Sequence, residues 1–129
     1  MSNFFAELEA GFKNHADQPA LILSGQDDWS YAELLLQINR AAAELAAIGA
    51  GAGDRVLVQL PKSSENLALY LACLKLGLVY VPLNTGYTAA ELDYFVSDAE
   101  PVLYVGEQHR SDVVSATLQL RDAERLLVF

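Results

Sequence analysis

The sequence is poor in cysteine and in basic residues. Cys73 is the single cysteine among 129 residues, so no internal disulfide can form, as expected of a protein in a reducing cytoplasm. Only 8 lysines and arginines stand against 17 acidic residues, which gives a formal net charge of −9. The basic residues form no cluster. This balance argues against a nucleic-acid partner and against an anionic membrane partner.

Long hydrophobic runs are also absent. The most apolar window, residues 67–83, is interrupted by Lys75, Gly77 and Pro82, so it is too short to span a bilayer. The first residues lack the basic start and apolar segment of a signal peptide. We read the apolar window as a buried helix followed by a buried strand, and we expect no membrane partner.

The residue types of common active sites are scarce or badly spaced. The two histidines, His15 and His109, are far apart, and no His, Cys or carboxylate spacing matches a metal site. No G-x-S-x-G motif or Cys/His pair supports a covalent nucleophile, and Cys73 falls in an apolar helical run as a buried structural thiol. We therefore predict no catalytic, cofactor-binding or metal-binding residue in this chain.

Glycine is concentrated in one stretch, at Gly49, Gly51 and Gly53, and raises the question of a phosphate-binding loop. Such a loop follows a strand and opens a helix, because helix N-terminal amides bind the phosphate. Here a helix over 31–48 comes first and a strand over 55–60 follows. The order is reversed, so we interpret the glycines as a turn.

The helix over 31–48 has clear boundary signals. Ser30 and Glu33 form the S-x-x-E pattern of a reciprocal N-terminal cap, and Gly49 suits a left-handed C-terminal cap. Apolar residues recur along one face at intervals of three and four: Leu34, Ile38, Ala41, Leu45 and Ile48. Before this helix we expect an amphipathic helix over 4–15 and a small hairpin. The helix carries Phe4, Phe5, Leu8 and Phe12 on one side, and the hairpin joins residues 20–24 and 29–31.

The rest of the chain alternates between strand and helix. This order is typical of right-handed βαβ units, hence of an α/β fold with a mostly parallel sheet and helices on both faces. Thr88 and Glu91 form a second capping box at one helix start. The predicted strands are 55–60, 79–83, 102–105 and 126–129, and the predicted helices are 64–76, 89–97 and 108–123.

Ligands of open α/β sheets bind beyond the carboxyl ends of the strands, so a binding site would be expected at these ends. The first carries Lys62, Ser63 and Ser64, which we read as a helix cap rather than a phosphate site. The segment 84–87, Asn-Thr-Gly-Tyr, is either an ordinary loop or a site for a small polar ligand, and the loop is favoured. The segment 106–109 carries no phosphate loop. The acidic residues Asp27, Asp28 and Glu100 read as turn residues.

Three ordered motifs resemble those of the adenylate-forming enzymes, a family that includes acyl-CoA synthetases. Trp29-Ser-Tyr-Ala-Glu-Leu34 resembles their (T/S)-Y-x-E-L motif, and Gly53-Asp-Arg-Val56 resembles their G-D-R-V. The segment 74–84, LKLGLVYVPLN, is similar to their L-K-x-G-x-x-Y-V-P motif. The segment 82–101, PLNTGYTAAELDYFVSDAEP, is most similar to malonyl-CoA synthetases. The likeness covers essentially the whole chain.

The resemblance implies an ATP- and Mg²⁺-dependent ligase that joins a malonate-like carboxylate to coenzyme A through an acyl-adenylate. The family's phosphate loop, acyl pocket and C-terminal domain have no counterpart in residues 1–129. We therefore expect an N-terminal fragment of the large domain, inactive alone and prone to form homo-oligomers through exposed apolar surface. Two alternatives stay open: a free-standing flavodoxin-like or receiver-like binding domain, and an interaction module without catalysis.

Overall fold

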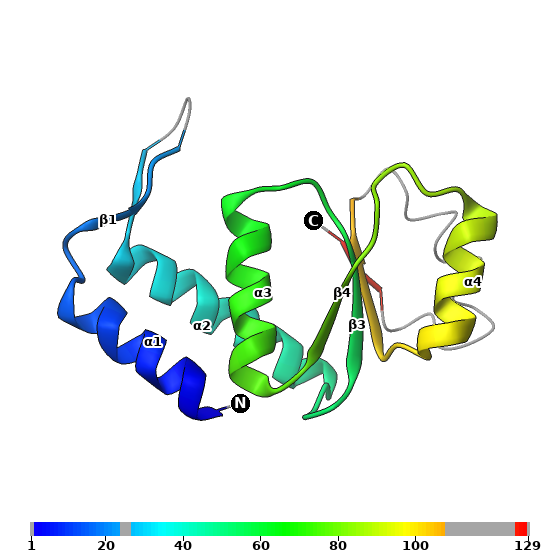
Figure 1. The fold of residues 1–129 in the computed structure, drawn as a ribbon, viewed down its shortest axis with the longest axis horizontal. Coiled ribbons are helices and arrows are strands. Elements are labelled where there is room, and N and C mark those ends of the chain that lie inside the picture. The colour runs from blue at the N-terminus through cyan, green and yellow to red at the C-terminus, as the bar shows by residue number, and fades with distance from the viewer. Residues whose placement is uncertain (1, 24–26, 108–125, 129) are drawn as a thin grey trace. The chain divides into compact units, whose positions relative to one another are not determined.

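The computed structural model describes residues 2–23, 27–107 and 126–128 (Figure 1). The chain divides into two compact units, which are described separately. The helical unit comprises Met1–Gly51 and Lys62–Gly77, and the sheet unit comprises Ala52–Pro61 and Leu78–Phe129.

The helical unit is built from three helices that pack on one another and from a short hairpin. The helices are α1 (Ser2–Asn14), α2 (Tyr31–Ile48) and α3 (Ser64–Leu76). The hairpin pairs β1 (Pro19–Leu21) with β2 (Trp29–Ser30) in antiparallel orientation, with an irregular register. The expected hairpin is confirmed, but its strands are shorter than predicted, since β1 ends at Leu21 and α2 begins at Tyr31.

The predicted caps of α2 are present with one difference. Ser30 Oγ accepts a hydrogen bond from the Glu33 amide at 3.1 Å, and Gly49 adopts the left-handed conformation at φ +98°. The Glu33 carboxylate, however, accepts from the Gln37 side chain at 2.8 Å instead of returning to the cap. The reciprocal half of the expected box is therefore replaced by a bond one turn further along the helix.

Two details of the expected apolar faces are wrong. In α2 the buried residues are Leu34, Ile38, Ala42 and Leu45, so Ala42 is buried in place of Ala41. In α1, Phe5 is 3% exposed whereas Phe4 is 56% exposed. Neighbouring residues on a helix point about 100° apart, so two adjacent phenylalanines cannot both face the same core.

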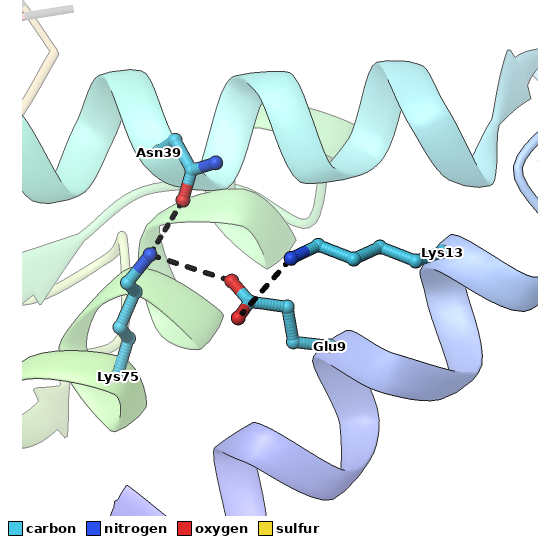
Figure 2. A network of polar contacts seen from close by, with 4 residues as sticks. All are labelled: Glu9, Lys13, Asn39 and Lys75. Atoms are coloured by element: carbon cyan, nitrogen blue, oxygen red, sulfur yellow. Dashed lines mark hydrogen bonds and ion pairs between the residues drawn. The ribbon is translucent and has the colours of Figure 1, made fainter.

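A polar network joins the three helices of this unit (Figure 2). Lys75 Nζ in α3 donates to Asn39 Oδ1 in α2 at 2.7 Å and lies 3.5 Å from Glu9 Oε2 in α1. Lys13 also approaches Glu9, at 3.9 Å, and the Lys75 ammonium lies 5.6 Å from the centroid of the Phe5 ring. One lysine thus contacts both neighbouring helices, which favours a single packing arrangement.

The sheet unit is built on four parallel strands in the order β4-β3-β5-β6. They are β3 (Arg55–Gln59), β4 (Val79–Pro82), β5 (Leu103–Gly106) and β6 (Leu126–Val128). The register places Leu57 beside Val81 on one side and beside Tyr104 on the other. These findings confirm the predicted fold class, an α/β arrangement with a parallel sheet, helices and a short N-terminal hairpin.

Helix α4 (Ala89–Ala99) covers one face of this sheet. It begins with the predicted capping box, in which Thr88 and Glu91 bond each other's backbone amides. Its buried face forms one apolar core with the sheet: Leu57, Leu83, Leu92, Val96 and Tyr104. The predicted helix over 108–123 lies outside the described residues.

Candidate functional site

The carboxyl ends of β3 and β5 form the best candidate site on topological grounds. The chain runs from β3 to β4 on one side and then crosses to β5 on the other, so the strand order reverses between β3 and β5. Open α/β sheets bind ligands in the crevice at such a switch point. The register brings Gln59, the last residue of β3, directly beside Gly106, the last residue of β5.

A buried hydrogen-bonded pair occupies this switch point. Gln59 is fully buried, and its Oε1 accepts a hydrogen bond from the hydroxyl of Tyr104, which is also buried. Gln59 Nε2 donates to the main-chain oxygen of Asn84, just past β4, at 2.9 Å. A buried amide left without partners would cost roughly 1–3 kcal/mol, so both bonds are needed to keep glutamine here.

Gly106 is required by its neighbour Tyr104. A Cβ atom built on Gly106 would overlap the Tyr104 ring at Cε1, Cζ and the hydroxyl oxygen. The ring therefore lies against the bare backbone at the end of β5, while its hydroxyl reaches Gln59. Tyr104 and Gln59 thus bond each other where β3 and β5 end.

The loop after β4 is held by its own hydrogen bonds and by Gln59. The Asn84 side chain accepts from the Gly86 amide at 2.7 Å, and the Asn84 carbonyl accepts from the Tyr87 amide at 3.1 Å. The Tyr87 ring stacks on Phe95 of α4, with centroids 5.1 Å apart and an interplanar angle of 14°. This geometry fits the predicted strand-to-helix loop.

The other predicted turn and cap residues take those roles. Ser63 caps α3, since its Oγ accepts from the Asn66 amide at 3.0 Å. Gly49 and Gly53 have φ of +98° and +86° on the link between α2 and β3, so the glycine stretch is a turn as predicted. Asp28 accepts a hydrogen bond from the Leu23 amide at 3.0 Å.

The two histidines, for which no site was predicted, are not brought together in the described residues. The His15 ring, past the end of α1, lies 6.5 Å from the Tyr31 ring, and His109 falls outside the described residues. Among residues 2–23, 27–107 and 126–128, no three His, Cys, Asp or Glu side chains gather as metal ligands would. Within the same residues, every helix is too short or too polar to cross a lipid bilayer.

Cys73 is a structural thiol, as predicted. It is completely buried in α3, and this burial raises the pKa of the thiol to about 12. The reactive form of cysteine is the thiolate, which is disfavoured in apolar surroundings. At neutral pH the group stays protonated and acts as a small apolar side chain.

Sequence reasoning missed two polar contacts of the sheet unit. The first is the Gln59–Tyr104 pair, which a lone glutamine inside the apolar run 55–60 could have signalled. The second is Arg55, whose guanidinium donates to the carbonyl oxygens of Ala99 and Glu100 at the end of α4. In the described structure the arginine of the G-D-R-V motif thus stabilises a helix end.

Comparison with known proteins points to one family. The family profile described as AMP-binding enzyme matches residues 8–128. The chain is similar to apo MatB from Rhodopseudomonas palustris, with 42% identity and a TM-score of 0.85, over 92% of this chain and 24% of that chain. It is also similar to coronafacic acid ligase from Pectobacterium brasiliense, with 26% identity and a TM-score of 0.85, over 97% of this chain and 25% of that one.

A curated relative agrees with these structures. The probable CoA ligase CCL9 from Humulus lupulus is 34% identical over 98 residues, which cover 76% of this chain and 19% of the relative. The chain therefore spans about a quarter of the length of the similar solved structures and less of this curated relative.

Proposed function

Because this chain belongs to the AMP-binding enzyme family, we propose that it forms the N-terminal part of the large domain of an ATP-dependent acyl-CoA synthetase. The observation that carries the proposal is the likeness to MatB, which extends over 92% of this chain at 42% identity but over only 24% of that structure. In this proposal the remainder of the enzyme holds ATP, Mg²⁺, coenzyme A and the catalytic residues, and residues 1–129 provide a scaffold.

The proposed reaction has two steps. A carboxylate oxygen attacks the α-phosphorus of ATP, the bond to pyrophosphate breaks, and an acyl-adenylate forms. The thiolate of coenzyme A then attacks the acyl carbon and displaces AMP. Charge on the transferring phosphate must be neutralised by Mg²⁺ and by hydrogen-bond donors.

We propose malonate as the carboxylate, in the cytoplasm. The support is the resemblance of residues 82–101 to malonyl-CoA synthetases, together with the higher identity to MatB than to coronafacic acid ligase. Both structures give a TM-score of 0.85, so backbone shape does not distinguish between acids. Identity in side chains is what favours the malonate assignment.

AMP release by the intact protein tests this proposal. With Mg-ATP and coenzyme A present, malonate should give the highest kcat/KM, methylmalonate a lower value, and acetate and palmitate little turnover. A preference for palmitate would overturn the malonate assignment and leave the ligase assignment standing. An intact protein that releases no AMP with any of these acids would overturn the ligase assignment.

A free-standing nucleotide-binding domain is the second candidate, and one observation favours it. The order β4-β3-β5-β6 is the order 2-1-3-4 of flavodoxin-like sheets, which bind ligands at the switch point. Titration calorimetry of the 129-residue chain separates the two candidates. The scaffold proposal expects no saturable heat with Mg-ATP or coenzyme A, whereas a micromolar Kd, about 8 kcal/mol of binding, would favour the free-standing domain.

A further inference from the structure

We propose that Gln59 and Tyr104 are positioning residues, which hold the loop 84–88 as one wall of a ligand crevice at the switch point of the sheet. The identity of the ligand, a substrate of the ligase, rests on the function proposed above. The geometry of the loop itself stands independently of that function.

The loop begins directly beside the switch point. Val58 pairs with Pro82 in the parallel register, and the Leu83 amide donates to the Val58 carbonyl at 2.8 Å. Asn84 therefore leaves the sheet next to Gln59, at the edge where ligands of open α/β sheets bind. Any ligand in that crevice would lie close to this loop.

Gln59 is a central support of the loop. The Asn84 carbonyl accepts two hydrogen bonds, one from Gln59 Nε2 at 2.9 Å and one from the Tyr87 amide at 3.1 Å. The Asn84 side chain folds back on the Gly86 amide. Because both ends of Asn84 are engaged, the loop has one preferred conformation, and one of its anchors comes from the neighbouring strand.

Tyr104 fixes the orientation of the Gln59 amide. Its hydroxyl donates to Oε1, which leaves Nε2 to face the Asn84 carbonyl. The flipped amide would place Oε1 against that carbonyl, two acceptors without a proton between them. Gly106 in turn leaves the room that the Tyr104 ring needs. The three residues therefore act as one support, with Gln59 as the contact to the loop.

Gln59 is a polar residue in an otherwise apolar, buried part of β3. Val56, Leu57 and Val58 of the same strand are all buried and apolar. An apolar side chain in place of Gln59 could be buried here without hydrogen bonds, but it could not orient the loop 84–88. Buried polar networks whose groups are all bonded specify one conformation.

Hydrogen exchange in the 129-residue chain tests the positioning. Gln59→Met keeps an unbranched side chain of similar length and removes both bonds, whereas Tyr104→Phe removes one. Val58→Ala is the matched control, because it weakens the same buried strand without touching the network. Relative to amides of β3, exchange at Gly86 and Tyr87 should rise about fivefold or more in Gln59→Met. The rise should be smaller in Tyr104→Phe and absent in Val58→Ala.

Equal exchange at these two amides in all four proteins would overturn the positioning role. If Gln59→Met does not fold, Tyr104→Phe decides the matter, because it removes a single hydroxyl and keeps the ring. A Tyr104→Phe protein whose loop amides exchange like the wild type would then refute the proposal.

Kinetics of the intact protein test the crevice. KM is measured separately for Mg-ATP, malonate and coenzyme A, with the other two saturating. Gln59→Met should raise at least one KM about tenfold, because the unsupported loop would lose contact with the ligand worth about one hydrogen bond, with kcat changed by less than about twofold. Val58→Ala should change none of the three KM values.

Three unchanged KM values in Gln59→Met would overturn the proposal that the loop 84–88 forms a wall of the ligand crevice. A wild-type protein without ligase activity would overturn only the proposed function. The positioning role of Gln59 and Tyr104 would still be tested by the exchange experiment.

Discussion

The guanidinium of Arg55 donates a hydrogen bond from Nη2 to the main-chain oxygen of Glu100, 3.2 Å away. Its Nε donates to the carbonyl of Ala99. The last carbonyls of a helix have no partner within the helix, so a side chain that bonds them stabilises the helix end. Here the start of β3 supports the end of α4, although Arg55 and Glu100 are 45 positions apart in the sequence.

Replacing Glu100 by glycine should stabilise the chain. Glu100 has φ +47°, a left-handed conformation that costs a residue with a Cβ roughly 1 kcal/mol more than glycine. Its contact with Arg55 uses only the backbone oxygen, which glycine retains. We expect Glu100→Gly to raise the free energy of unfolding in urea by about 0.5–1 kcal/mol.

Asp98→Gly is the control for this change. Asp98 is an exposed residue of α4 with ordinary helical geometry, so glycine there should lower the free energy of unfolding by about 0.5–1 kcal/mol. Both variants remove one negative charge, and only the backbone conformation differs. A loss of stability in Glu100→Gly would contradict the strained-cap interpretation.

Adding one methyl group at Gly106 should destabilise the sheet unit. The new Cβ would overlap the ring of Tyr104, and overpacking of a buried site costs about 1–3 kcal/mol. Gly11→Ala is the opposite case, because the space around Gly11 in α1 is open and alanine favours a helix by about 0.5–1 kcal/mol. In thermal and urea unfolding, Gly106→Ala should lower the free energy of unfolding and Gly11→Ala should raise it.

A double-mutant cycle identifies the cause of the Gly106→Ala effect. In a Tyr104→Leu background the overlapping ring is gone, so the same alanine should cost clearly less than in the wild type. Equal costs in the two backgrounds would assign the effect to the backbone of β5 instead of to the Tyr104 ring.

The buried thiol of Cys73 should make stability depend on pH in the alkaline range. Its pKa is raised from 9.0 to about 12 in the folded chain, because burial disfavours the thiolate. Between these values the unfolded state releases the proton and the folded state keeps it, so the free energy of unfolding falls as the pH rises. The stabilisation is fully present below about pH 9.

Cys73→Ala isolates this contribution from other groups that titrate at high pH. The difference in unfolding free energy between wild type and Cys73→Ala should shrink from pH 9 upward and stay constant from pH 6 to pH 8. In the native state the thiol should also resist alkylation at pH 8 and react once the chain is unfolded. A constant difference up to pH 11 would contradict the raised pKa.

Local signals account for what the sequence could predict. Helices α2 and α3 begin at their predicted caps, Ser30 and Ser63, and α2 ends at Gly49 as predicted, because capping depends on residues within one turn. The alternation of strands and helices likewise predicted the parallel sheet. Those features needed no knowledge of distant contacts.

The candidate site depended on contacts that the sequence does not display. Gln59 meets Tyr104 across 45 positions, and nothing local to either residue indicates the other. The same holds for Lys75, which reaches Glu9 over 66 positions (Figure 2). A polar residue inside an apolar strand signals that a partner exists, but only the strand register identifies it.

The 129-residue chain should associate with further copies of itself. β4 lies at one edge of the described sheet, and Val79 on it is 46% exposed, while Tyr94 on α4 is 63% exposed. An outer strand is a template for pairing with another copy. If association covers about 800 Å² of apolar surface, the gain is on the order of 20 kcal/mol at about 25 cal/mol per Å². The opposing cost of association is of order 4–15 kcal/mol or more.

We therefore expect a dimer or larger assembly in light scattering across a hundredfold dilution. Val79→Lys should shift the equilibrium toward the monomer, because a charge on an outer strand opposes pairing between copies. Ala43→Lys adds the same charge at an exposed position of α2 and should leave the assembly unchanged. A mass that stays at one 14.0 kDa chain at every concentration would show that these apolar side chains do not drive association. Equal dissociation by both lysine variants would instead attribute the effect to net charge, because the two variants share only that change.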